Sequence, residues 1–258
     1  MATKTEVEIK FGDLEMLVAV APFDQDLAAL QRENAALTTA RQVALVRIIA
    51  GPKSSISQYG SWVAENIVYF PNGQIFITPA KYSPILKRAF GATAAYRSGE
   101  EFYISEEEAA SLEKLAKSGE VYTLKQNENY QIPIKEFAKD GLARFVFGDT
   151  AADYANFLQE AGVNEVPVWL ANPKQVKEQK APFARALWVS GLSGRSDLDG
   201  NNWSLYVGGR ARGARKASGA SAGVANAYES IAQKYGLKSP DNLRDILEKH
   251  TKAREALQ

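Results

Sequence analysis

The chain has 258 residues, and its 31 basic and 30 acidic side chains give a net charge of +1, so it is not a polyelectrolyte. It has no cysteine and one histidine, which excludes disulfides, thiol nucleophiles, thiolate zinc sites and multi-histidine metal sites within the chain. No apolar run approaches the roughly 18 residues of a membrane span, and the N-terminus does not resemble a signal peptide. We therefore expect a cytoplasmic protein with no membrane partner.

Two hairpins are predicted in the first third of the chain. Thr5–Lys10 alternates polar and apolar residues, and Leu14–Val20 follows after a Gly-Asp turn. Asn66–Phe70 and Gln74–Thr78 flank Pro-Asn-Gly, whose Asn and Gly tolerate positive φ. Each pair predicts two antiparallel strands.

Helix signals lie between and after these hairpins. An amphipathic helix is predicted from Leu27 to Ala40, whereas Val43–Ile49 fits either a helix or a buried strand. Ser83 followed by proline predicts a short helix, because serine caps and proline suits the first turn. Ser105 followed by three glutamates predicts another, because acidic side chains favour a helix N-terminus.

The second half of the chain mixes strand and helix signals. A helix is predicted over 150–161, ending at Gly162. A second β-ribbon is predicted from Ala184–Ser190 and Trp203–Val207. Further strands are expected at 120–124, 130–134, 142–147 and 166–170.

No regular strand-helix-strand alternation runs through the chain, so the fold class predicted is α+β, with a mixed, mostly antiparallel sheet and several short helices. We expect a main domain over 1–208 and a flexible basic Gly/Ala/Ser segment over 209–223. A C-terminal segment of two helices is expected over 224–258.

The candidate site is a basic tract near residue 210. Four cations fall within seven residues, separated only by glycine and alanine: Arg210, Arg212, Arg215 and Lys216. Residues 209–258 hold ten cations and five acids, a net charge of +5. Arginines can grip phosphates through paired hydrogen bonds, and Arg/Gly tracts follow single-stranded nucleic acid. The alternative is a solvated linker to the terminal helices.

Aromatic residues precede this tract. On a strand over Trp203–Val207, Trp203 shares an apolar face with Leu205 and is expected in the core, whereas Tyr206 could stack on a base. The run Leu205–Arg212, LYVGGRAR, resembles the strand of bacterial-type single-stranded DNA-binding proteins in which aromatic-Val-x-Gly precedes basic residues. That family has an OB-fold, but the resemblance covers eight residues and no family site residue is carried over.

Catalytic and metal signals are sparse. A Ser-His-Asp triad would have to use His250, which lies in a charged helical stretch. Asp197 and Asp199 could supply oxygens to a cation, but an EF-hand loop needs glycine at its sixth position and a carboxylate at its twelfth, and counting from Asp197 these positions hold Asn202 and Gly208. The simpler interpretation is a loop in which these side chains stabilise turns. We expect no cofactor.

Three functions follow in order of preference. The first is a non-catalytic nucleic-acid-binding protein that contacts the phosphate backbone of single strands through the basic Arg/Gly tract, with DNA and RNA not distinguished. The second is a structural or assembly subunit of a larger protein complex or viral particle, including self-association. The third is a carboxylate- and metal-dependent enzyme.

Overall fold

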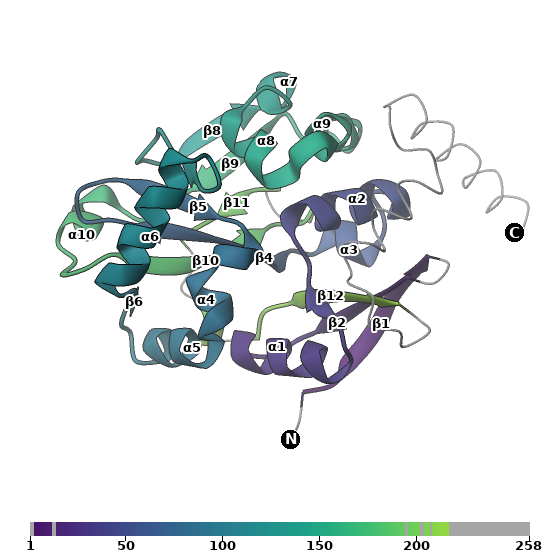
Figure 1. Cartoon of the computed structure of the whole chain (residues 1–258). Coiled ribbons are helices and arrows are strands. Elements are labelled where there is room, and N and C mark those ends of the chain that lie inside the picture. Colours follow the sequence, from purple (N-terminus) through teal and green to yellow (C-terminus); the bar gives the residue numbers. More distant parts are fainter. Residues whose placement is uncertain (1–2, 12–13, 194–195, 202–203, 207, 217–258) are drawn as a thin grey trace, which may run out of the picture.

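The computed structural model describes residues 3–11, 14–193, 196–201, 204–206 and 208–216 (Figure 1). Within this part, helices lie on both sides of one mixed sheet, which confirms the α+β class. None of the described helices has the length and apolar character needed to cross a bilayer.

The strands form one sheet with the order β1-β2-β12-β4-β10-β11-β9-β8 along its main path. β3 pairs with β12, β6 with β10, and β5 with both β4 and β7. Most pairs are antiparallel, and β12/β4 and β11/β9 are parallel. The strands are β1 (Thr5–Phe11), β2 (Leu14–Ala19), β3 (Ala36–Leu37), β4 (Ser61–Tyr69), β5 (Ile75–Thr78), β6 (Phe102–Tyr103), β7 (Tyr122–Thr123), β8 (Tyr130–Pro133), β9 (Glu165–Trp169), β10 (Phe183–Val189), β11 (Leu198–Asp199) and β12 (Ala211–Lys216).

Strand β4 lies at the centre, and all nine of its residues are buried. Successive side chains of a strand face opposite sides of a sheet. Val63 and Ile67 accordingly join one apolar core with α2, α8 and α9, and Trp62 and Val68 join the other with α1, α4, α5 and α6. Figure 1 shows α8 and α9 on one side of the molecule and α1 and α5 on the other.

Capping residues define several of the helices. Thr39 and Gln42 form a capping box at α2, and Ser105 and Glu108 form one at α6. Ser83 caps α4. The α-helices are α1 (Phe23–Arg32), α2 (Ala40–Ala50), α3 (Ser55–Gln58), α4 (Pro84–Lys87), α5 (Ala89–Arg97), α6 (Glu106–Lys117), α7 (Ile134–Phe137), α8 (Gly141–Phe147), α9 (Ala151–Glu160) and α10 (Pro173–Lys177). The 3-10 helices are η1 (Ala80–Tyr82), η2 (Gly148–Thr150) and η3 (Ser204–Tyr206).

Both predicted hairpins are confirmed as β1/β2 and β4/β5, and the open segment Val43–Ile49 is helix. The strand predicted over 142–147 is wrong: the residues form α8, whose first turn is capped by the Asp140 carboxylate. The ribbon predicted between Ala184–Ser190 and Trp203–Val207 is also wrong, since β10 pairs with β4 and residues 204–206 form η3. The resemblance of residues 205–212 to an OB-fold strand is therefore not matched at residues 205–206, which are helical. Trp203 lies outside the described residues.

The flexible segment predicted over 209–223 is wrong where it can be compared. Residues 211–216 form β12, whose six residues all pair with β2 and whose first residue, Ala211, also pairs with Trp62 of β4. Backbone pairing on both sides fixes these residues inside the sheet. Residues 217–223 and the C-terminal helical segment predicted over 224–258 lie outside the described residues.

Candidate binding site at the start of strand β12

The structure directs Arg212 of the basic tract into the protein. Its side chain is 0% exposed, and Nε and Nη2 donate to the two carboxylate oxygens of Glu8 on β1, at 2.6 and 3.0 Å. Nη1 donates to the carbonyl oxygens of Gly60, at 3.0 Å, and Tyr59, at 3.4 Å. The guanidinium is therefore used inside the fold and offers no donor to a phosphate.

Arg215 is also paired within the protein. Its Nη2 lies 2.9 Å from a carboxylate oxygen of Glu15, and its Nη1 pairs with Glu33. Glu15 holds the pKa of Arg215 above its ordinary value, with a smaller contribution in the same direction from Glu33. Lys216 ends β12, and its side chain lies outside the description.

Arg210 differs from these two arginines. It is half-buried, and its guanidinium lies over the ring of Tyr59, 4.1 Å from the centroid, in a cation–π contact. In the described part of the chain it forms no ion pair with a carboxylate. Tyr59 is 46% exposed, so the two side chains together form a surface feature. We call it the Tyr59–Arg210 pair.

Tyr206, the ring expected beside the tract, belongs to η3 and is 40% exposed. η3 packs against α5, and the aromatic partner of Arg210 is Tyr59. Tyr206 is thus exposed and Arg210 is half-buried, and the structure pairs Arg210 with a residue that the sequence did not single out.

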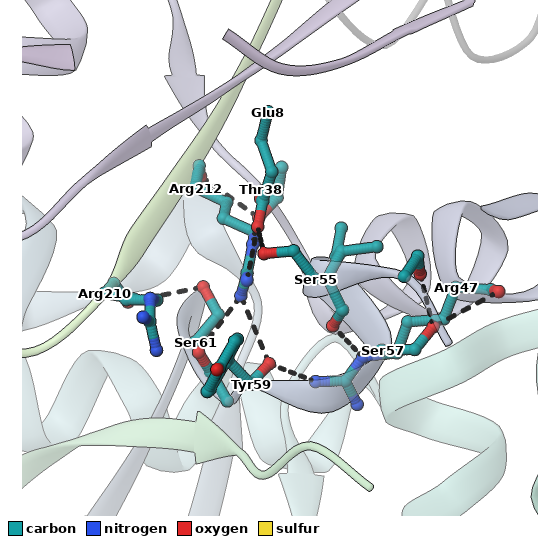
Figure 2. A network of polar contacts seen from close by, with 12 residues as sticks. Glu8, Thr38, Arg47, Ser55, Ser57, Tyr59, Ser61, Arg210 and Arg212 are labelled. Atoms are coloured by element: carbon teal, nitrogen blue, oxygen red, sulfur yellow. Dashed lines mark hydrogen bonds and ion pairs between the residues drawn. The ribbon is translucent and has the colours of Figure 1, made fainter. Parts of the chain in front are cut away.

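Two buried arginines hold the segment that carries Tyr59. Arg47 is fully buried on α2, and its guanidinium donates to four backbone carbonyls and one hydroxyl, that of Tyr154 at 2.7 Å. The carbonyls belong to Ile56, Ser190, Tyr59 and Val189, at 2.9, 2.9, 3.2 and 3.3 Å. The Tyr59 carbonyl thus accepts from both Arg47 and Arg212, which reach it from two sides in Figure 2. The backbone under the exposed ring is fixed by these bonds.

Glu8 completes this network. Burial acts to raise the pKa of its carboxyl, but the hydrogen bonds and charge of Arg212, helped by the Ser55 hydroxyl, outweigh burial and hold it below its ordinary value. The charge of Arg210 acts in the same direction. Burial lowers the pKa of Arg212, and Glu8 opposes that effect. Glu8 is therefore the counterion of the buried guanidinium.

The two aspartates considered for a metal hold loops instead. Asp197 accepts hydrogen bonds from the indole nitrogen of Trp169, at 2.9 Å, and from the Ser190 hydroxyl. Asp199 accepts from the backbone amide of Asn201 at 2.8 Å, and burial raises its pKa to about 6. Among the described residues, no group of three or more His, Cys, Asp or Glu side chains could hold a metal ion. The Asp199 bond is of the side-chain-to-backbone kind that stabilises turns, whereas the bonds of Asp197 join it to side chains elsewhere in the fold.

Sequence reasoning missed Arg47, Glu8 and Tyr59. A signal existed for Arg47, because a lone cation inside the apolar run Val43–Ile49 is typical of a buried, hydrogen-bonded guanidinium. Glu8 belongs to the alternating strand Thr5–Lys10, but alternation alone does not show which face carries a buried partner.

Comparisons with known proteins address the fold. No known protein family and no curated protein matches the sequence. A solved structure concerned with the accommodation of massive sequence variation in Nanoarchaeota by the C-type lectin fold matches with a TM-score of 0.58 and 14% sequence identity. The match covers 82% of this chain and 100% of that one. The chain thus has a fold similar to the C-type lectin fold, and at this identity the similarity describes the fold alone.

Proposed function

We propose that this protein is a non-catalytic binding module that recognises a protein partner through the Tyr59–Arg210 pair. The observation that carries the proposal is Arg210: in the described part of the chain it has no carboxylate partner, although Arg212 and Arg215 both have one. A guanidinium stacked on a half-exposed ring retains donors for an acidic group of a partner.

The chemistry of the pair suits a protein interface. Tyrosine and arginine are enriched among the residues that dominate binding energy, because each buries a large area and also makes directed polar contacts. Preorganisation adds to affinity because less side-chain and loop freedom is lost on binding. The bonds from Arg47 and Arg212 to the Tyr59 carbonyl supply that preorganisation.

Nucleic-acid binding has less support from the structure than from the sequence alone. Affinity for a polyanion grows with the number of phosphates neutralised. Two cations of the tract are neutralised by glutamates, and over residues 1–216 the formal charges cancel. Nucleic acid is therefore kept as an alternative outcome of the test.

The test is site-specific crosslinking. The photoreactive amino acid p-benzoylphenylalanine is placed at position 208 of the full chain, two residues before Arg210, where an added Cβ meets nothing within 4 Å, so that Tyr59 and Arg210 stay intact. The protein is irradiated in an extract of the source organism, and adducts are identified by mass spectrometry. A crosslinked protein is then purified and titrated against wild type, Arg210→Ala and the control Arg41→Ala, which removes a different surface arginine, one paired with Asp149.

We expect Arg210→Ala to raise the dissociation constant by about 30-fold, which is the effect of removing an interface hot-spot residue. Arg41→Ala should change it by less than about twofold. Two results would show that the site binds nucleic acid and not a protein. One is a nucleic-acid adduct, and the other is salt-sensitive binding of a labelled single-stranded 30-mer that Arg210→Ala reduces. The absence of any adduct, or an unchanged affinity in Arg210→Ala, would overturn the proposal.

A further inference from the structure

A carboxyl group is buried beneath the segment that carries Arg210. Asp26 lies on α1, on the side that contributes Phe23, Leu27 and Leu30 to the core, and it is 0% exposed. Neither of its carboxylate oxygens meets a donor with hydrogen-bond geometry in the described structure, although the backbone amides of Ala21 and Ala211 lie close enough to favour its charged form. A buried, ionised carboxylate without partners is costly, so such a group stays neutral until the pH is high.

Asp26 lies where two backbone segments meet. The Gly209 amide donates to the Ala21 carbonyl at 3.2 Å, which joins the turn before α1 to the segment before β12. The backbone amides of Ala21 and Ala211 act on the Asp26 carboxyl and favour its charged form. Ala211 directly follows Arg210, so the carboxyl lies next to the residues that position the Tyr59–Arg210 pair.

Among the side chains that the structure describes, the charged groups on the elements packed against α1 leave Asp26 without a counterion. On β12, Arg212 and Arg215 pair with glutamates, and Arg210 stacks on Tyr59. On β2, Glu15 pairs with Lys10 and Arg215. The other titratable groups on neighbouring elements are Tyr96 and Arg97 of α5 and Tyr206 of η3. The charge that acts on the Asp26 carboxyl is that of Asp24, and it too disfavours ionisation.

We infer that Asp26 is a protonation switch for the binding site: the neutral carboxyl lets α1 pack on the start of β12, and its ionisation loosens residues 209–211 and with them Arg210. The inference rests on the proposed function only for its consequence, since a loosened Arg210 would bind its partner less well. The switch itself can be measured without any partner.

The direction follows from the location of the group. Burial raises the pKa of Asp26 to about 8, against the smaller opposing effects of the Ala21 and Ala211 amides. Because this value lies above that of an aspartate in the unfolded chain, the neutral group contributes stability at low pH, and that stability is lost as the pH rises toward and through 8. Between pH 6 and 8 the closed state holds about one proton more than a state in which the carboxyl is exposed to water. The loss is therefore up to about tenfold per pH unit, and it levels off above pH 8.

The test compares amide hydrogen exchange, corrected for intrinsic rates, in wild type, Asp26→Asn and Asp149→Asn. The last removes an exposed carboxylate far along the chain as a control. Between pH 6 and 9 we expect protection at the first residues of β12 to fall by up to about 100-fold relative to β10 in wild type and in Asp149→Asn, and to stay constant in Asp26→Asn. A uniform loss over both strands, or the same loss in Asp26→Asn, would overturn the switch.

A second measurement needs no variant. The side-chain carboxyl carbon of Asp26 can be titrated by NMR in the wild-type protein, and a midpoint below pH 6 would also overturn the inference. A failure of either measurement leaves the Tyr59–Arg210 pair intact as a binding site. If the crosslinking test fails instead, the proposed function is overturned, but the hydrogen-exchange result for Asp26 still holds.

Discussion

Replacing Glu8 by Gln tests whether the arginine network supports the fold as described. The substitution keeps the shape of the side chain but leaves the Arg212 guanidinium, which is 0% exposed, without a counterion. Removing one partner of a buried ion pair costs about 3–5 kcal/mol, because the remaining charge is uncompensated. Gln retains an oxygen that accepts one hydrogen bond, so we expect about 3 kcal/mol, the lower end of that range.

The assay is urea denaturation at pH 7, with Glu6→Gln as the matched control. Glu6 lies two residues earlier on the same strand, is exposed, and should change the free energy of unfolding by less than about 0.5 kcal/mol. For a chain of this size the loss in Glu8→Gln corresponds to a fall in Tm of about 6–12 °C.

The pH dependence of the difference gives an independent check. Because Arg212 holds the pKa of Glu8 below its ordinary value of 4.5, the ionised carboxylate contributes stability above that pH, and this contribution is lost as the pH falls below it. The gap between wild type and Glu8→Gln should therefore narrow below pH 4.5. A loss under about 1 kcal/mol at pH 7, or one no larger than in Glu6→Gln, would show that the buried pair does not support the fold.

Three further substitutions probe other parts of the structure. A Cβ at Gly209 would lie 2.3 Å from Nε1 of Trp62, whereas one at Gly208 would meet nothing within 4 Å. In urea denaturation, Gly209→Ala should therefore lower the free energy of unfolding by about 1–3 kcal/mol, and Gly208→Ala should leave it almost unchanged. Burial raises the pKa of Glu65 to about 7, above its value in the unfolded chain. The free energy of unfolding of the wild type should therefore fall as the pH rises from 4.5 through 7. Denaturation curves measured across this range should show no such fall for Glu65→Gln. Thr39→Ala removes the cap of α2 and should lower the free energy of unfolding by about 1 kcal/mol; no change would contradict the capping box.

The predictions that held rest on local chemistry. The hairpin over Asn66–Thr78 follows from a Pro-Asn-Gly turn, and the helix after Ser105 follows from a cap and three glutamates, all within a few residues of one another. The strand predicted over Leu142–Phe147 was wrong because successive apolar residues fit a buried helix as well as a strand. Here the Asp140 side chain caps a helix.

The pairing of the arginines in the basic tract could not be predicted, for a non-local reason. Gly, Ala and Arg in succession suggest a mobile, solvated chain, but the partners of Arg212 and Arg215 lie about two hundred residues earlier, at Glu8 and Glu15. The spacing of residues within the tract does not show that those carboxylates pair with it. Arg210, the cation that stacks on Tyr59, could not be told from its neighbours for the same reason.

The place of β12 in the sheet constrains the order in which this chain can fold. β2 and β4 are made early in synthesis, yet the strand that lies between them is contributed by residues 211–216. Until those residues have left the ribosome, β2 and β4 each present an unpaired edge, and exposed strand edges invite pairing with other chains. Closing the sheet across some 150 to 200 residues is a high-contact-order step, which is slow. A nascent chain that stops before residue 211 should therefore aggregate, and one that extends past residue 216 can complete the centre of the sheet.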